Sequence, residues 1–196
     1  MGSLNAGVHN DARANSNVAI GNSAFLAGSM ADSGASVSQG NVCIGHEAAM
    51  TTGTNAQTGI TAVGFRALKA LTSGAGNTAV GYNSGATINT GSLNTFVGYL
   101  AGDGVDDGNN CVALGYSALR ANCGSNNTSV GKSSLEAATG VGNTALGNLA
   151  GYAVTGGGNN LMLGTDSGRT GSPGGNITTG SNEIVLGDEN ITEAHI

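Results

Sequence analysis

The sequence predicts an all-β protein, a parallel β-roll or β-solenoid of about ten short coils. Glycine accounts for 36 of the 196 residues, proline occurs once, and only 9% of the residues are charged. A typical globular domain has about 7% glycine and about 25% charged residues. A five-residue motif also recurs ten times with a period-two alternation. Because glycine and small residues suit the regular corners and narrow interior of a solenoid, these observations favour that fold over a core of large side chains.

The motif reads Asn, any residue, a small residue, Val, Ile or Leu, and then Gly. Its ten copies span residues 17–21, 41–45, 60–64, 77–81, 94–98, 111–115, 127–131, 143–147, 160–164 and 183–187. The final glycines are 16 or 17 residues apart between Gly64 and Gly164, and 19 to 24 residues apart outside that stretch. Such a period predicts one coil per copy.

Each coil is expected to hold two short strands that meet at the motif glycine. Glycine is expected at this corner either because a Cβ atom would crowd the bend or because φ must be positive. The second strand carries Ala or Ser three residues after the glycine, at Ala24, Ala48, Ala67, Ser84, Ala101, Ala118, Ser134, Ala150 and Ser167. Helix is not expected, because the alternation has period two and Gly, Asn and Thr are poor helix formers.

The first strand is apolar or small on both faces. Val80, for example, shares one face with Thr78, while Ala79 lies on the other. A coil of about 16 residues has a narrow lumen, so only one face points inward, and the alternation leaves open which one. The outward face would form a long apolar stripe, which monomers rarely expose. We therefore expect other subunits to cover it.

Asparagine opens seven of the ten motif copies, at Asn17, Asn41, Asn77, Asn94, Asn127, Asn143 and Asn160. Stacked at one position of successive coils, these side chains are expected to form an amide ladder. The repeats define one solenoid domain over residues 15–196, preceded by an N-terminal segment at residues 1–14.

The charge and hydropathy pattern argues against two classes of partner. The net charge is −6 and no basic stripe occurs, so a nucleic-acid partner is not expected. No apolar run reaches the roughly 18 residues of a membrane span. The first residues also lack the basic and apolar regions of a signal peptide. We therefore expect no membrane insertion.

The sequence predicts neither an enzyme nor a cofactor or metal site. It contains no P-loop, no Rossmann fingerprint and no GxSxG nucleophile elbow. The cysteines lack C-x-x-C spacing and are expected to be free thiols: Cys43, Cys111 and Cys123. The histidines stand far apart: His9, His46 and His195. Glu47 beside His46 could suggest acid–base chemistry, but no nucleophile accompanies the pair.

One loop contains a fragment of a calcium motif. Gly102, Gly104 and Asp106 match part of the calcium-binding nonapeptide, but the match occurs once, and Gly108 stands where an aliphatic residue is required. Asp106 and Asp107 are adjacent, so we expect solvated turn residues rather than the paired carboxylates of a glycan hydrolase.

Two features are candidate receptor-binding elements, although no receptor-binding residue is assigned. The residue after the motif glycine is aromatic in four successive coils, at Phe65, Tyr82, Tyr99 and Tyr116. At a coil spacing of about 4.8 Å these rings would form a ladder, either a sugar-stacking strip or a structural stack, and the second is favoured. The insertions 26–40 and 168–182 fit recognition loops and tolerated surface insertions equally well.

The repeats resemble the head repeats of trimeric autotransporter adhesins. They are still more similar to the shaft repeats of bacteriophage tail fibres, in which NTAVGY-type strings recur at this period; here that string stands at residues 77–82. The closing stretch, residues 181–196, is similar to the segment that precedes the intramolecular chaperone domain of many tail fibres and tailspikes. The resemblance covers residues 15–196 and implies a parallel homotrimer of β-rolls whose assembly a C-terminal chaperone assists.

The expected function is therefore that of a structural and receptor-binding segment of a tail fibre, which attaches a virion to the host bacterial surface. Its partners would be two further copies of the chain, other tail proteins and a bacterial surface glycan or protein. Such a fibre would be assembled in the host cytoplasm. The alternative is the head domain of a bacterial trimeric adhesin, and a capsule-cleaving tailspike enzyme is a third, less favoured class.

Overall fold

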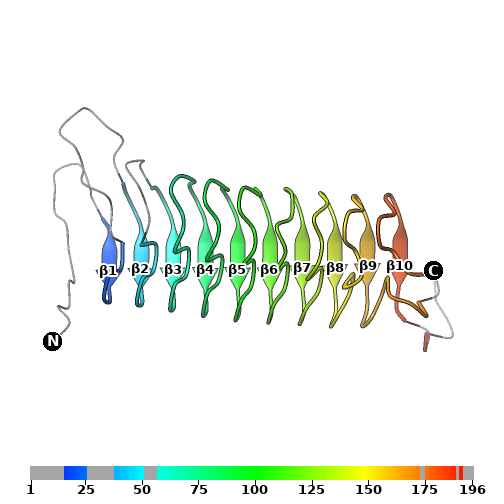
Figure 1. The fold of residues 1–196 in the computed structure, drawn as a ribbon. Coiled ribbons are helices and arrows are strands. Elements are labelled where there is room, and N and C mark those ends of the chain that lie inside the picture. The colour runs from blue at the N-terminus through cyan, green and yellow to red at the C-terminus, as the bar shows by residue number, and fades with distance from the viewer. Residues whose placement is uncertain (1–15, 26–37, 51–56, 173–174, 189, 192–196) are drawn as a thin grey trace.

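The computed structural model describes residues 16–25, 38–50, 57–172, 175–188 and 190–191. Ten three-residue strands lie in these ranges: β1 Val18–Ile20, β2 Val42–Ile44, β3 Thr61–Val63, β4 Thr78–Val80, β5 Thr95–Val97, β6 Val112–Leu114, β7 Thr128–Val130, β8 Thr144–Leu146, β9 Leu161–Leu163 and β10 Ile184–Leu186. They form one parallel sheet in chain order (Figure 1). The predicted all-β parallel solenoid is thus confirmed, with one strand per motif copy and no helix among the described residues. The predicted N-terminal segment, residues 1–14, lies outside those ranges.

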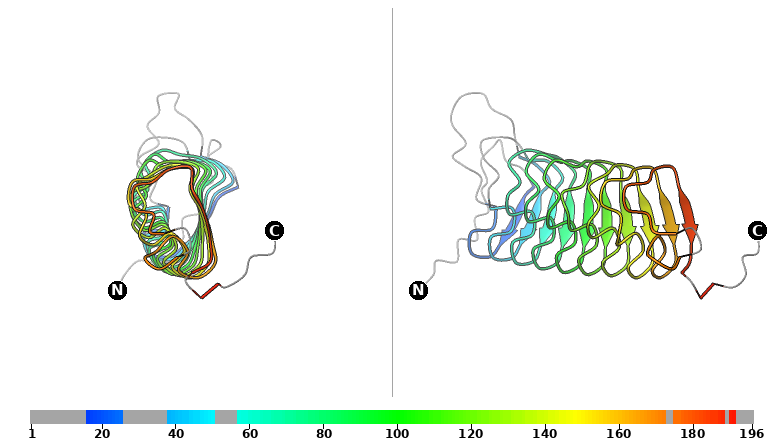
Figure 2. Two further views of the ribbon diagram at one scale, coloured as in Figure 1. Left: turned by 90° about the vertical axis from the view of Figure 1, so that its right-hand side faces the viewer. Right: turned by 45° about the vertical axis from the view of Figure 1, so that its right-hand side comes forward.

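Successive coils stack in register. Each strand residue pairs with the residue at the same motif position in the next coil, as Ala79 does with Phe96 and Val80 with Val97. Seen along the solenoid axis, the coils superimpose into one closed outline (Figure 2, left). Because the period is 16 or 17 residues between β3 and β9 and the strands pair in register, features that repeat in the sequence form columns along the axis.

The central residue of each strand points into the lumen. The ten central residues are at most 7% exposed: Ala19, Cys43, Ala62, Ala79, Phe96, Ala113, Ser129, Ala145, Met162 and Val185. The first and third residues of each strand point outward and are half-buried or exposed. The structure therefore decides between the two faces: the small residues fill the lumen, and the Thr, Val, Ile and Leu side chains form the outer face of the sheet.

A tight turn, not a second strand, follows the first nine motif glycines, so that prediction is wrong. The second and fourth residues after the glycine have positive φ, as at Arg66 (57°) and Leu68 (51°). Their amides bond to both neighbouring coils: Arg66 N–H donates to the His46 carbonyl at 2.9 Å, and Leu68 N–H to the Ser84 carbonyl at 3.0 Å. Left-handed residues at every other position fold the chain back, whereas a strand needs extended backbone throughout. The predicted Ala or Ser column is nevertheless buried.

The motif glycines are required on both of the predicted grounds. Gly98 has a φ of 136°, and a Cβ atom on it would lie 2.6 Å from the carbonyl oxygen of Gly115 in the next coil. The same contact joins Gly81 to Gly98, so these corners form a row along the axis. Any side chain here would separate two coils.

The motif asparagines bridge coils through the backbone more than through each other. Asn77 is fully buried; its Oδ1 accepts the backbone N–H of Asn94 at 3.0 Å, and its Nδ2 donates to the Gly91 carbonyl at 2.8 Å. A direct amide contact, Asn94 Nδ2 to Asn77 Oδ1 at 3.1 Å, accompanies these bonds. Each asparagine therefore supplies hydrogen-bond partners to backbone groups just before the strand, where the hydrogen bonds of the sheet do not yet reach. The predicted ladder exists, but its main bonds run from side chain to backbone.

Large lumen residues are matched by glycines in the facing turn. Phe96 is flanked by Gly85 and Gly102, and a Cβ atom added to these glycines would lie 2.8 and 2.6 Å, respectively, from its ring. Met162 is flanked in the same way by Gly151 and Gly168. In three coils whose lumen residue is alanine or serine, leucine occupies this turn position, at Leu68, Leu119 and Leu135. Ala79 and Ala145 instead share their coils with Gly85 and Gly151, because the next coil carries Phe96 or Met162. The lumen keeps a constant cross-section because large and small residues alternate between strand and turn.

Candidate binding surfaces

The aromatic residues after the motif glycines form the expected ladder, extended by one residue. His46, Phe65, Tyr82, Tyr99 and Tyr116 stack in this order, with ring centroids 4.9–5.5 Å apart and ring planes within 10° of parallel. The three tyrosines are 43–51% exposed. The ladder lies one residue beyond the corner glycines, so it borders the outer face of the sheet. His46 could have been included from its place in the repeat.

Stacking leaves little ring face for a ligand along this ladder. Phe65, Tyr82 and Tyr99 each have a ring on both sides, so only their edges and polar tips face solvent. A sugar that stacks on an aromatic side chain needs a ring face. The geometry therefore favours the structural interpretation, in which the stacked rings stabilise contacts between neighbouring coils.

Glu47, beside His46, is held in an ion-pair cluster. Its carboxylate lies 2.7 Å from Arg66 Nε and 2.9 Å from Lys69 Nζ. Hydrogen bonds from Lys69 and Arg66 hold the pKa of Glu47 below its usual range. His46 Nδ1 is 4.0 Å from the same carboxylate while its ring stacks on Phe65. A carboxylate engaged by two cations is a weak base, and through these ion pairs Glu47 ties two neighbouring coils together.

The outer face of the sheet is uncharged over its whole length. Its third-residue column is entirely aliphatic, and its first-residue column consists of Thr, Val, Leu and Ile. Its most exposed members are Val18, Ile20, Val80, Val97, Leu146, Ile184 and Leu186. Parallel sheets occur almost only with both faces covered. This face is therefore the strongest candidate for a contact with other protein.

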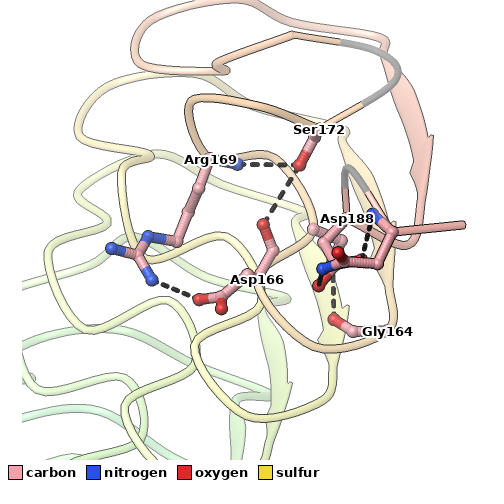
Figure 3. A network of polar contacts seen from close by, with 7 residues as sticks. Gly164, Asp166, Arg169, Ser172 and Asp188 are labelled. Carbon is pink, nitrogen blue, oxygen red and sulfur yellow. Dashed lines mark hydrogen bonds and ion pairs between the residues drawn. The ribbon is translucent and has the colours of Figure 1, made fainter.

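The C-terminal insertion carries a compact polar network. Arg169 pairs with Asp166, the Arg169 N–H donates to Ser172 Oγ at 3.3 Å, and Ser172 Oγ donates to the Asp166 carbonyl at 3.1 Å (Figure 3). Ile177 then returns to the core. The network borders a pocket of about 240 Å³ lined by Asp166, Arg169, Thr170, Ser172, Asp188 and Asn190. Of the other insertion, residues 26–37 lie outside the described residues.

The calcium-like fragment has a packing explanation. Gly102 makes room for the Phe96 ring, and a Cβ on Gly104 would lie 2.1 Å from the Arg120 carbonyl oxygen. Asp106 and Asp107 are exposed, as expected for turn residues. Within the described ranges no three His, Cys, Asp or Glu side chains are grouped to hold a metal ion. The same ranges include no helix of the length and apolarity that crossing a bilayer requires.

All three cysteines are free and buried. Burial raises the pKa of Cys43 to about 12. Cys111 stands at the motif position that asparagine usually occupies, and its Sγ donates to the Gly124 carbonyl at 3.4 Å, as an asparagine amide does in other coils. A hydrogen bond from Cys123 lowers the pKa of Cys111 to about 7, while the pKa of Cys123 is raised. Cys43 therefore stands in the place of a lumen residue, and Cys111 in the place of a motif asparagine.

A charged ridge on the solenoid was not predicted from the sequence. It consists of the residues five positions after the motif glycine in four successive coils: Arg120, Glu136, Tyr152 and Arg169. Arg120 Nη1 lies 3.4 Å from Glu136 Oε1, and the Arg169 guanidinium lies over the Tyr152 ring at 5.5 Å. The fixed spacing from the glycines was the signal that could have found the ridge, because equal spacing places residues side by side.

Comparison with known protein families, curated proteins and solved structures finds no match for this chain.

Proposed function

We propose that this chain is the repeat shaft of a bacteriophage tail fibre, that three copies assemble side by side, and that the trimer takes part in attachment of the virion to a bacterial surface glycan or protein. The proposal rests on the resemblance of the repeats to those of tail fibres and on one structural observation. That observation is the outer face of the solenoid sheet.

The outer face supports assembly because its composition is that of a buried surface. Ten aliphatic side chains, one per strand, run along it without a charged neighbour on the strands. Depletion of charge is the compositional mark of the centre of a protein–protein interface. Val80 and Val97 are 36% and 39% exposed in the single chain, and association would remove them from water. The tyrosine ladder beside this face offers amphipathic rings suited to the edge of such an interface.

A straight stack of coils also suits a fibre. Each coil bonds only to its neighbours, so the solenoid extends a binding surface away from a base without a large globular core. Three copies would present each weak contact three times, and the avidity of a trimer exceeds the affinity of one site by orders of magnitude.

The experiment that tests this proposal has two measurements. Light scattering of the purified chain should give a mass of three times the 18.9 kDa of one chain. The labelled protein should then bind cells of at least one strain in a panel of bacteria, and surfaces coated with extracellular matrix should not retain it. Retention on matrix without binding to bacteria would favour an adhesin head instead, and binding to neither would overturn the attachment role.

A further inference from the structure

The ridge contains a pocket of about 350 Å³ whose lining combines an aromatic ring, a carboxylate and a guanidinium. It is lined by Arg120, Glu136 and Tyr152 of the ridge and by Ala121 and Ala137, which follow the ridge position in two of these coils. Small-molecule sites in proteins combine a few convergent polar groups with an apolar lining, and this hollow combines the same kinds of group while lying open to solvent.

Tyr152 turns one ring face toward this pocket. The Arg169 guanidinium lies over its ring from the coil on the C-terminal side, whereas every other residue of the pocket comes from a coil on the N-terminal side. The ring face opposite Arg169 therefore lies on the side from which the other residues of the pocket come. Phe65, Tyr82 and Tyr99 differ from Tyr152 in this respect, because a ring covers each of their faces.

The polar groups of the pocket keep hydrogen-bonding capacity. Arg120 and Glu136 meet at one contact of 3.4 Å, which leaves a second carboxylate oxygen and further N–H groups unused in that contact. The side chains are 50% and 22% exposed. A carboxylate and a guanidinium each bind two neighbouring hydroxyl groups with two parallel hydrogen bonds. Because their charges balance, the pocket favours an uncharged ligand.

We propose that this pocket binds a neutral sugar ring, with the C–H face of the sugar on Tyr152 and its hydroxyl groups on Glu136 and Arg120. A phosphate or an acidic sugar fits less well, since Glu136 opposes an anion and the chain carries a net charge of −6. This inference deepens the proposed attachment function and rests on it for its biological meaning. The binding itself is a property of the single chain.

The test is saturation-transfer NMR on the intact chain with methyl glycosides of glucose, galactose, N-acetylglucosamine and rhamnose, each at about 10 mM to detect affinities in the millimolar range. At least one glycoside should receive saturation from the protein. Tyr152→Ala should weaken its binding by roughly tenfold or more, and Glu136→Gln should weaken it to a smaller degree. Tyr152→Phe should retain binding, because it keeps the ring.

Tyr99→Ala is the matched control, since it removes from the ladder a tyrosine of similar exposure (47%, against 40% for Tyr152) and should leave sugar binding unchanged. Circular dichroism of each variant establishes that the solenoid is intact. No transfer to any glycoside, or equal transfer in the Tyr152→Ala chain, would overturn the pocket. If the wild-type trimer binds bacteria and the Tyr152→Ala trimer binds them equally, the pocket fails while the attachment function stands. Sugar binding without binding to cells would reject the attachment function alone.

Discussion

The residue before each motif asparagine, or before its counterpart in copies that lack it, is in the left-handed region in all ten coils. Nine of these positions hold residues that tolerate positive φ or are small: Ser16, Gly40, Gly59, Gly76, Asn110, Asn126, Gly142, Asn159 and Asn182. The tenth is Leu93, with a φ of 61° and 62% of its surface exposed. For a side chain without a local hydrogen bond to offer, this conformation costs about 1–2 kcal/mol. Leu93 is therefore a strained residue with little burial in return.

We predict that Leu93→Asn stabilises the protein. Asparagine is the residue that this column uses at four other coils, and it visits the left-handed region at lower cost. The expected gain in the free energy of unfolding is about 0.5–1 kcal/mol, measured by urea or thermal denaturation. Leu93→Ala serves as the control, because it removes the exposed side chain and keeps a backbone with the same penalty. An equal gain in both variants would assign the effect to the lost leucine side chain and not to the backbone.

The Glu47 cluster predicts a pH dependence with a definite sign. Because the native pKa of Glu47 lies below its usual value, the folded state favours the ionised carboxylate. Its contribution to stability is present above the ordinary glutamate pKa of 4.5 and is lost as the pH falls through the lowered native value. The unfolding midpoint should therefore fall between about pH 6 and pH 3 by more in the wild type than in Glu47→Gln. Lys69→Met should resemble Glu47→Gln, and an unchanged pH profile in both would show that the cluster contributes nothing.

At the scale of the element, the unit of packing is a strand residue and the turn positions on either side of it. Phe96 occupies a lumen position that is alanine in both neighbouring coils, Ala79 and Ala113. Gly85 and Gly102 supply the space that its ring needs. Leucine takes the same turn position with positive φ at Leu119 and Leu135 elsewhere, so the backbone accepts a side chain there when the strand residue is small.

This pairing predicts a non-additive double-mutant cycle. Phe96→Ala leaves a cavity and should cost about 3–5 kcal/mol. Gly102→Leu alone should also destabilise, because its Cβ atom would lie 2.6 Å from the Phe96 ring. Together the two changes reproduce the alanine–leucine arrangement of other coils. The double variant should therefore lose less free energy of unfolding than the sum of the two single losses, by at least about 1 kcal/mol. Strictly additive unfolding free energies would show that the two positions do not compensate.

The elements that could be predicted from sequence are those that repeat. Ten copies of one motif define the strands, their register and the corner glycines, because equivalent motif positions stack on one another even where the loop between two copies is longer. The second strand could not be excluded in this way. Whether residues such as Arg66 and Leu68 are extended or left-handed depends on hydrogen bonds to both neighbouring coils, which the sequence pattern does not encode. The sugar pocket depends on single residues such as Tyr152. They stand at a repeated position, but the residue type at that position differs from coil to coil.

At the scale of the whole molecule, the sheet has one face in the lumen and one outside. The inner face is sealed by alanine, serine and a few larger residues, with the turn of each coil packed against it. The outer face has no such cover within the described part of the chain, and β1 and β10 lie at its two ends (Figure 1). A sheet of ten parallel strands at about 4.8 Å spacing is about 48 Å long. An aliphatic column of this length is the property of the molecule that most needs a partner.

Because Val80 and Val97 lie on the outer face of the sheet, charges placed there should disrupt the assembly and leave the solenoid folded. The double variant Val80→Asp, Val97→Asp places two charges on the outer face, where the single chain leaves these positions partly in water. In a single chain, water can therefore solvate both carboxylates. A subunit interface would bury these like charges, so the subunits should dissociate. The scattering mass should fall from three chains to one, while the circular dichroism spectrum of the solenoid persists.

Ala79→Asp is the matched variant on the opposite face. Ala79 is 0% exposed between Ala62 and Phe96, so a carboxylate there would be buried without a partner at a cost of several kcal/mol. It should abolish the β spectrum along with the assembly, because each coil is stabilised only through its neighbours. If the outer-face double variant keeps the mass of three chains, the contact lies on another surface, and the tyrosine ladder is the next place to introduce charge. If it unfolds as Ala79→Asp does, then association and coil formation are one process, and the solenoid exists only in the assembled state.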